Sequence, residues 1–157
     1  MKQIYLFPGT LAVSREPAEI TTILGSCVAI ALHDRELRLG GLNHYLLPEA
    51  QPNDPQSARY GSSALPLLLQ ALEALGSRPR TLLAKVYGGA NVLQNVTIGE
   101  GIGRLNIQLA LNLLAELKIP VVEQNTGGTL GRRIVLNTGS FEVRHEFPSD
   151  RNHGSAA

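Results

Sequence analysis

Cysteine is nearly absent from this sequence of 157 residues, which contains a single one, Cys27. One cysteine cannot form an intramolecular disulfide, so the chain must fold without such cross-links. This usage is typical of proteins in a reducing compartment, and we expect a cytoplasmic location.

Long hydrophobic runs and a strong charge of one sign are also missing. The longest weakly polar stretch, residues 20–32, is too short to span a bilayer, and Thr, Gly and Ser interrupt it. The apolar segment 4–13 is broken by Pro8 and Gly9 and has almost no basic lead-in, unlike a signal peptide. The net charge of +1 lacks the basic excess of nucleic-acid-binding domains. We therefore expect no membrane insertion and no nucleic-acid partner.

The composition that is present is that of an ordinary globular protein. Hydrophobic residues make up 43% and charged residues 17%, a balance that permits a sizeable core. The length predicts a single domain, which we place at residues 1–148. Residues 149–157, SDRNHGSAA, are polar and small, and we expect them to be a disordered C-terminal tail.

Periodicity predicts an α+β fold with mixed β-sheets flanked by two helices. Apolar residues at helical spacing indicate helices at 63–76, with Ser62 or Ser63 as the N-cap and Gly76 as the stop, and at 104–120. Enrichment in Val, Ile and Thr indicates strands elsewhere, the last two forming a hairpin around the NTGS turn. The predicted strands are 3–7, 19–26, 27–34, 40–48, 80–89, 121–126, 131–138 and 140–147.

Cys27 is a candidate nucleophile because the sequence offers each group that thiol catalysis needs. His44 follows Gly40 and Gly41, and an antiparallel pairing would bring its imidazole across from Cys27 as a base. The hydroxyl of Thr21, six positions before the cysteine, would orient that imidazole. Gly25 and Ser26 have little bulk, so their backbone would admit a substrate carbonyl and support an oxyanion.

The same residues also have structural interpretations. A cysteine in a strand of small, apolar residues is more often a buried core residue than a nucleophile. His44 alone is more often a hydrogen-bonded structural residue than a base. His33 lies beside Asp34 and Arg35 in a predicted turn, which favours a solvated surface position. The four histidines and Cys27 do not have metal-ligand spacing, so we predict no metal site.

Four segments in order resemble one known family, the chemoreceptor glutamine deamidases called CheD. They are LGSCVAIAL at 24–32, GGLNHYLLP at 40–48, KVYGGANV at 85–92 and GGTLGRRIVLNTGSFEVR at 127–144. With the two helices, the resemblance covers residues 3–147. The family usually has IG-x-R-N before its second helix, whereas this chain has IGEGIGRLN at 98–106, which predicts extra residues there.

The resemblance implies a cysteine hydrolase that converts receptor glutamines to glutamates through a thioester. It implies the catalytic residues Cys27, His44 and Thr21, a fold similar to a toxin-type glutamine deamidase, and no cofactor. The substrate would be the helical cytoplasmic domain of a chemoreceptor, and a CheC-type phosphatase would be a possible partner.

Two other functions stay open at this point. The chain would be a non-catalytic chemotaxis adaptor if it used the fold only for docking to receptors or to a phosphatase. It would be a receptor methylesterase if the thioester chemistry opened a methyl ester. A nucleotide-binding role is disfavoured, because the glycine-rich GGANV and GGTLGRR match neither a P-loop nor a dinucleotide fingerprint. Glycines there are expected to serve turns and close backbone approach.

Overall fold

The described chain is built from strands and two main helices. A computed structural model describes residues 1–50, 52–54, 57–92 and 101–147. The helices are α1 (Gly61–Ala74), the 3₁₀ helix η1 (Pro79–Thr81) and α2 (Ile102–Glu116). The strands are β1 (Lys2–Tyr5), β2 (Leu11–Ser14), β3 (Ala18–Leu24), β4 (Val28–Asp34), β5 (Leu39–Asn43), β6 (Leu82–Gly88), β7 (Val121–Thr126), β8 (Arg132–Asn137) and β9 (Val143–Glu146).

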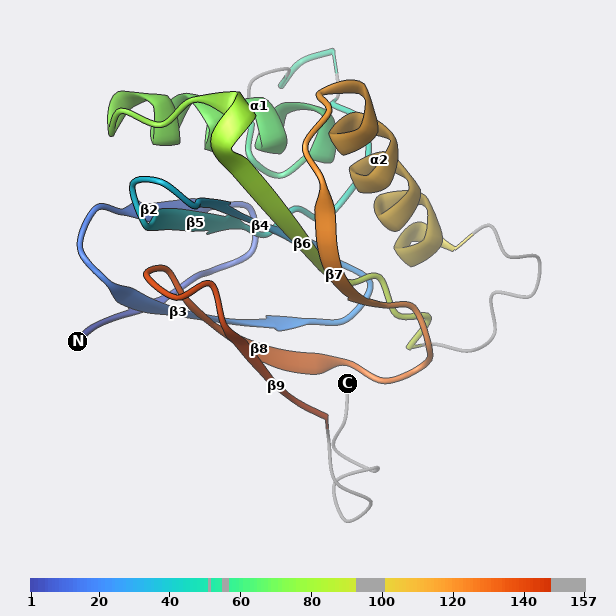
Figure 1. Cartoon of the computed structure of the whole chain (residues 1–157). Helices are drawn as coiled ribbons and strands as arrows, with labels where there is room; N and C mark the ends of the chain where they lie inside the picture. Colours follow the sequence, from blue (N-terminus) through green and yellow to red (C-terminus); the bar gives the residue numbers. More distant parts are fainter. Residues whose placement is uncertain (51, 55–56, 93–100, 148–157) are drawn as a thin grey trace.

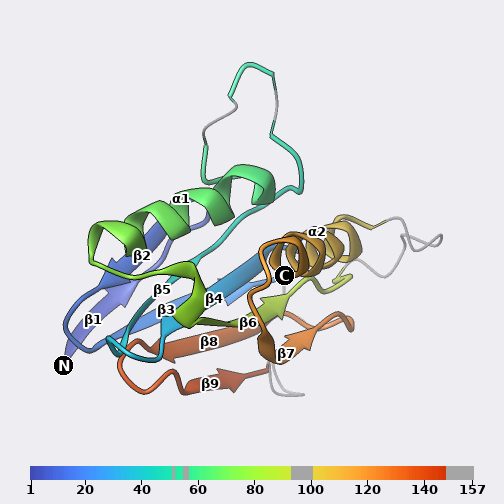
Figure 2. The same cartoon turned by 45° about the horizontal axis from the view of Figure 1, so that its top comes forward.

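These strands form two mixed sheets, which confirms the predicted α+β class. The outer sheet has the order β1-β3-β8-β9, and the central sheet has the order β2-β5-β4-β6-β7. The β1/β3 and β6/β7 pairs are parallel, and the other pairs are antiparallel. The outer sheet covers one face of the central sheet and both helices cover the other, so the molecule has three layers (Figures 1 and 2).

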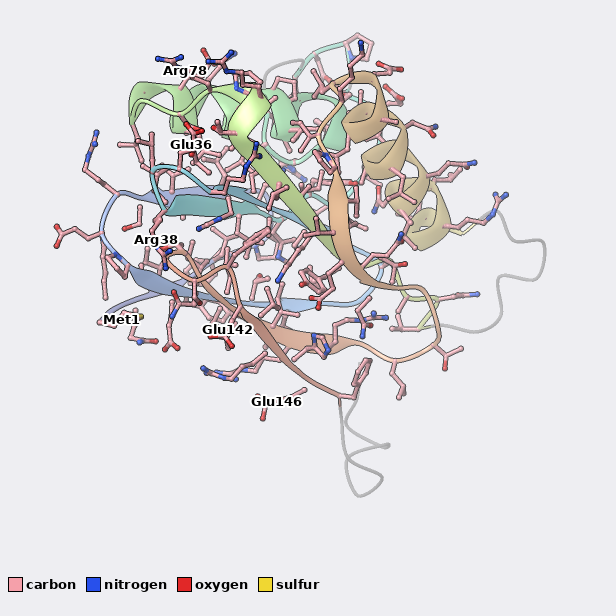
Figure 3. All side chains as sticks on the ribbon, viewed as in Figure 1. Met1, Glu36, Arg38, Arg78, Glu142 and Glu146 are labelled. Carbon is pink, nitrogen blue, oxygen red and sulfur yellow. The ribbon has the colours of Figure 1, made fainter. Side chains whose placement is uncertain are left out.

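The central strand β4 has both faces buried, which explains its nearly continuous apolar sequence. Successive side chains of a strand point to opposite faces. Val28, Ile30 and Leu32 pack toward the helices, whereas Ala29 and Ala31 pack toward the outer sheet. Charged side chains such as Arg78 and Glu146 are exposed and point outward, away from both cores (Figure 3).

The start of α1 and one strand differ from the sequence predictions. Helix α1 begins at Gly61, and its N-cap is Tyr60, which makes no side-chain capping bond, so neither Ser62 nor Ser63 caps it. Strand β2 was not predicted, because its four residues follow a Pro-Gly turn and pair only at the sheet edge beside β5. The β8–β9 hairpin around residues 137–140 is as predicted.

Two further expectations concern the C-terminal tail and membrane insertion. The predicted tail at 149–157 lies outside the described residues. Among the helices of the described chain, none is long and apolar enough to cross a membrane.

Candidate active site

Cys27 lies on the short turn between β3 and β4, at the end of the central sheet. Its backbone carbonyl accepts the N–H of Gly89 at 2.8 Å, and the carbonyl of Gly25 accepts the N–H of Ala90 at 2.9 Å. Gly88 has a φ of +105°, and a Cβ there would lie 2.2 Å from the Cys27 carbonyl oxygen. The glycines that end β6 therefore serve the close backbone approach predicted for them, and they hold the cysteine turn in place.

His44 follows β5 and faces the same side of the central sheet as Cys27. Val28 and Tyr45 form an antiparallel bridge, exchanging backbone bonds of 3.1 and 2.9 Å. The ring of His44 points into the space between the two sheets, since it contacts Thr22 of the outer sheet. The thiol packs against the core between the two sheets. The predicted antiparallel approach of the two segments is confirmed.

The hydroxyl in contact with the His44 ring is that of Thr22, whereas the sequence predicts Thr21 as the orienting residue. Thr22 is fully buried, and its Oγ1 lies 2.7 Å from Nδ1 of His44. Thr21 is its neighbour in β3, so its side chain points to the opposite face. The six-position spacing between Thr21 and Cys27 does not decide which threonine faces His44, because residues 25–27 lie outside the strands and the alternation of faces does not continue through them.

The hydrogen bonds of Thr22 fix the tautomer of His44. The Thr22 hydroxyl donates its one proton to the carbonyl of Leu6 at 2.7 Å, so toward the histidine it can only accept. Nδ1 of His44 must then carry the proton and donate it to Thr22. In the neutral ring this leaves the lone pair on Nε2, a buried atom without a hydrogen-bond partner among the described residues. An imidazole in this tautomer can accept a proton only at Nε2.

Burial keeps both reactive groups neutral. It lowers the pKa of His44 from 6.5 to about 4, and it raises the pKa of the Cys27 thiol above 9.0, an effect that the backbone N–H of Cys27 partly offsets. At pH 7 the site therefore holds a thiol and a neutral imidazole. This arrangement suits a base that removes the thiol proton as the sulfur attacks, since an ion pair is not formed beforehand.

A cleft of about 290 Å³ opens at Cys27. Its other lining residues are Ser26, Leu46, Leu47, Arg59, Tyr60 and Ile102. Ser26 lines the cleft, whereas Gly25 lies in the turn behind it and its carbonyl accepts the N–H of Ala90. Arg59 was not predicted from the sequence, because it lies between the predicted strand at 40–48 and the predicted helix at 63–76, where no pattern singles it out.

Asn106 is a second residue that sequence reasoning missed. It lies on α2, is fully buried, and donates its side-chain amide to the carbonyls of Ser26 at 3.1 Å and Leu46 at 2.9 Å. The signal that marks it is the IGRLN segment, in which an asparagine occupies a buried helical position. Helix α2 begins at Ile102, and residues 98–100 of the predicted insertion lie outside the described chain.

The remaining histidine prediction concerns His33, which is buried rather than solvated. Its Nε2 lies 3.1 Å from the carbonyl of Gly139, and its ring stacks on Phe141 at 4.9 Å. Over the residues that the structure describes, no three His, Cys, Asp or Glu side chains gather as they would around a metal ion.

Comparisons with known proteins agree with the resemblance in the sequence. A family model described as CheD chemotactic sensory transduction matches residues 46–146. The probable chemoreceptor glutamine deamidase CheD 1 of Anaeromyxobacter dehalogenans is 46% identical over 86% of this chain and 78% of its own. The corresponding protein of Trichlorobacter lovleyi is 44% identical over 88% of this chain and 86% of its own.

A solved structure is a more distant neighbour. The Bacillus licheniformis hypothetical protein YfiH superposes with a TM-score of 0.43 at 14% identity, over 72% of this chain and 50% of that chain. This likeness is too distant to support an argument about function. The family match and the identity to the curated relatives are sufficient by themselves: the chain belongs to the CheD family.

Proposed function

We infer that this chain is a chemoreceptor glutamine deamidase, which hydrolyses the side-chain amides of selected receptor glutamines to carboxylates. Relatives at 46% and 44% identity carry that name. The observation that supports it best is the bond from Nδ1 of His44 to Thr22, which leaves Nε2 free on the face shared with Cys27. This is the arrangement that a thiol nucleophile requires of its base.

In the first half of the reaction, Nε2 of His44 takes the Sγ proton of Cys27 while the sulfur attacks the amide carbon of a glutamine side chain. The amide oxygen becomes an oxyanion, which backbone N–H groups at Ser26 and Cys27 stabilise. His44, now charged, returns its proton to the amide nitrogen, and ammonia leaves. A thioester between Cys27 and the glutamyl side chain remains.

In the second half, a water molecule replaces ammonia. Nε2 of His44 takes one proton from the water as its oxygen attacks the thioester carbonyl. The carbon–sulfur bond breaks, the proton returns to Sγ, and a glutamate is released. Throughout, the Thr22 hydroxyl accepts the Nδ1 proton and is itself held by the Leu6 carbonyl, so the ring keeps one orientation for both proton transfers.

The rim of the cleft suits a protein substrate. Leu47 and Ile102 expose 38% and 40% of their surface there, and Arg59 supplies a cation. An exposed apolar edge with one charge matches the helical cytoplasmic domain of a receptor, whose side chains would reach the thiol one at a time. The new carboxylate would change the packing of that helix face and so tune signalling.

Three finer expectations belong to this proposal. The protein acts in the cytoplasm, a CheC-type phosphatase is a candidate partner, and the fold is related to toxin-type glutamine deamidases. They derive from the family resemblance in the sequence.

The direct test is to incubate the purified chain with a receptor cytoplasmic fragment and to map amide-to-acid mass changes by peptide mass spectrometry. We expect conversion at a few glutamines. As the matched control, the thiol of Cys27 is converted to a methyl disulfide with a thiol-specific reagent and then restored with a reductant. Because Cys27 is the sole cysteine, activity should vanish and return.

A second arm of the test uses a methylated fragment and measures methanol release. Methanol without any glutamine conversion would favour the methylesterase. Tight binding of the fragment without either reaction would favour the adaptor. Either result would contradict the proposed function.

A further inference from the structure

Asn106 is an unusual residue for its place in the fold. The fully buried stripe of α2 consists of Gly103, Asn106, Ala110 and Leu114, so a carboxamide stands where the pattern calls for an apolar side chain. Its Nδ2 donates to two carbonyls, but its Oδ1 is buried and lacks a partner among the described residues. A buried acceptor without a partner destabilises the fold, so this asparagine requires an explanation.

The orientation of the carboxamide is fixed by its neighbours. Both polar contacts are backbone carbonyl oxygens, of Ser26 and Leu46, and only the amide nitrogen can donate to them. Flipping the group would turn the acceptor toward two acceptors. The amide nitrogen therefore bridges two carbonyls, and the free Oδ1 is the consequence of this bridge.

The bridge stands where the sheet pairing of the two catalytic segments ends. An antiparallel ladder that continued beyond Val28 and Tyr45 would next join Ser26 to Leu47. Instead, the N–H of Leu47 donates to the carbonyl of Arg59 at 3.2 Å. The two segments thus diverge at the point where one carries Cys27 and the other has just passed His44. At this point the side-chain amide of Asn106 donates a hydrogen bond to each segment, to Ser26 in one and to Leu46 in the other.

A further bond fixes the helix itself to the same place. The hydroxyl of Tyr45, the residue after His44, donates to the backbone carbonyl of Asn106 at 2.5 Å. Gly103, one turn earlier, packs so closely on the segment after β6 that a Cβ there would lie 2.4 Å from the carbonyl oxygen of Gly89. The helix can therefore not shift without moving the residues that support Cys27.

We propose that Asn106 is a positioning residue, whose amide bridge between the Ser26 and Leu46 carbonyls sets the separation of the Cys27 thiol from the His44 imidazole. The residue does not touch the reacting atoms; it acts through the two backbone segments. This inference rests on the proposed function, since it assigns Asn106 a part in the same reaction.

The test compares Asn106→Ala with Leu114→Ala, a buried truncation in the same stripe of α2 that leaves both carbonyls bonded. Two quantities are measured below the melting temperature of each variant. The first is deamidation of a receptor fragment, resolved into kcat and KM. The second is the rate at which iodoacetamide alkylates Cys27, which needs no receptor.

The two quantities should move in opposite directions in Asn106→Ala. Release of the cysteine turn should lower kcat by about 100-fold, because misplacement of reacting groups by an ångström has that effect, with little change in KM. The thiol should become more exposed, its pKa should return toward its ordinary value, and alkylation at pH 7.5 should become several-fold faster. Leu114→Ala should leave both quantities near those of the wild type.

The proposal is overturned if Asn106→Ala matches Leu114→Ala in both quantities. Where Asn106→Ala does not fold, Asn106→Leu replaces it, since it keeps an apolar volume in an apolar stripe without a donor. Failure of both variants to fold would assign the bridge to the stability of the fold and would also overturn the proposal. If the wild type deamidates no receptor fragment, the proposed function fails. The alkylation rates of the variants still show whether Asn106 holds the turn that carries Cys27 in place.

Discussion

At the scale of single residues, the hydroxyl of Thr22 connects the His44 ring to the backbone carbonyl of Leu6. Thr22→Val keeps the shape but removes both the acceptor for Nδ1 of His44 and the donor to Leu6. We expect kcat for deamidation to fall at least about tenfold, because the ring loses its fixed tautomer and orientation. Thr22→Ser keeps the hydroxyl and should retain most of the activity.

The matched control for this prediction is Thr21→Val, on the neighbouring residue of β3 whose side chain points to the other face. It should leave kcat close to the wild-type value. Turnover of the three variants is measured on one receptor fragment, with thermal melting as the check on folding. A larger loss in Thr21→Val than in Thr22→Val, at equal stability, would contradict the geometry described for the site.

The pH dependence of the reaction is a second prediction at this scale. His44 acts as a base only when it is unprotonated, and burial lowers its pKa to about 4. We expect kcat/KM to rise with pH through about 4, to stay level through neutrality, and to fall only above 9.0, where the thiol loses its proton. An acidic limb at pH 6.5 or above would show that the imidazole is not buried as described.

From the sequence, Ser26, Cys27 and His44 could be named as candidate site residues, whereas the other residues that the structure places beside them could not. Cys27 and His44 stand out because their residue types are reactive and their segments have a recognisable pattern. The choice between Thr21 and Thr22 depends on how the turn at 25–27 rotates the chain, which the spacing alone does not determine. Asn106 and Arg59 come near Cys27 only through tertiary packing.

At the scale of elements, the end of β6 supports the cysteine turn, and its glycines offer a sharp test. Gly88 and Gly127 both have positive φ, of +105° and +80°. A Cβ on Gly88 would lie 2.2 Å from the carbonyl oxygen of Cys27, whereas a Cβ on Gly127 would meet nothing within 4 Å. The two alanine variants therefore share the backbone strain, about 1–2 kcal/mol each, and differ only in the clash.

We expect Gly88→Ala to lose deamidation activity and to melt at a lower temperature than Gly127→Ala. The reason is that the new methyl group must displace the turn that carries the thiol. Gly127→Ala should show a modest loss of stability with nearly normal kcat in the receptor assay. Equal activity in the two variants would mean that the close contact between β6 and Cys27 is not needed.

The elements themselves were predictable where the periodicity was strong. Strand β4 and helix α2 follow from apolar runs and helical spacing. Strand β2 did not follow, because four residues at a sheet edge give too short a pattern. The start of α1 was misplaced because Tyr60, which makes no capping bond, takes a position where Ser62 and Ser63 looked like better caps.

At the scale of the whole molecule, the site joins all three layers. Thr22 comes from the outer sheet, Cys27 and His44 from the two segments at the end of the central sheet, and Asn106 from the helix layer. Local patterns predict which face of a strand is buried, but they do not specify which sheet packs on it. For that reason the sequence indicated the mixed sheets and the helices, and not the layer order seen in Figure 1.

The burial of His44 also predicts how the stability of the whole protein depends on pH. The unfolded imidazole takes up a proton near pH 6.5, whereas the folded one does so only near pH 4. Acid therefore favours the unfolded state, and His44 should remove about 3 kcal/mol from the free energy of unfolding as the pH falls between these values. Burial lowers the pKa of His33 as well, which adds to the loss in the same direction.

This dependence can be measured by urea unfolding at pH 7 and near pH 4. His44→Gln should be less stable at pH 7 but should lose less stability on acidification than the wild type. Cys27→Ala, which leaves both histidines in place, should keep the wild-type slope. An equal slope in His44→Gln would mean that His44 is not buried in its neutral form.

The most direct test of the central claim, that Cys27 is the nucleophile and His44 its base, is the turnover of Cys27→Ala and His44→Ala on a receptor fragment. Peptide mass spectrometry counts the glutamates formed, and circular dichroism shows whether each variant is folded. Both folded variants should form no more glutamate than a sample without enzyme, since alanine carries neither thiol nor imidazole. Deamidation at the wild-type rate by folded Cys27→Ala would contradict the account.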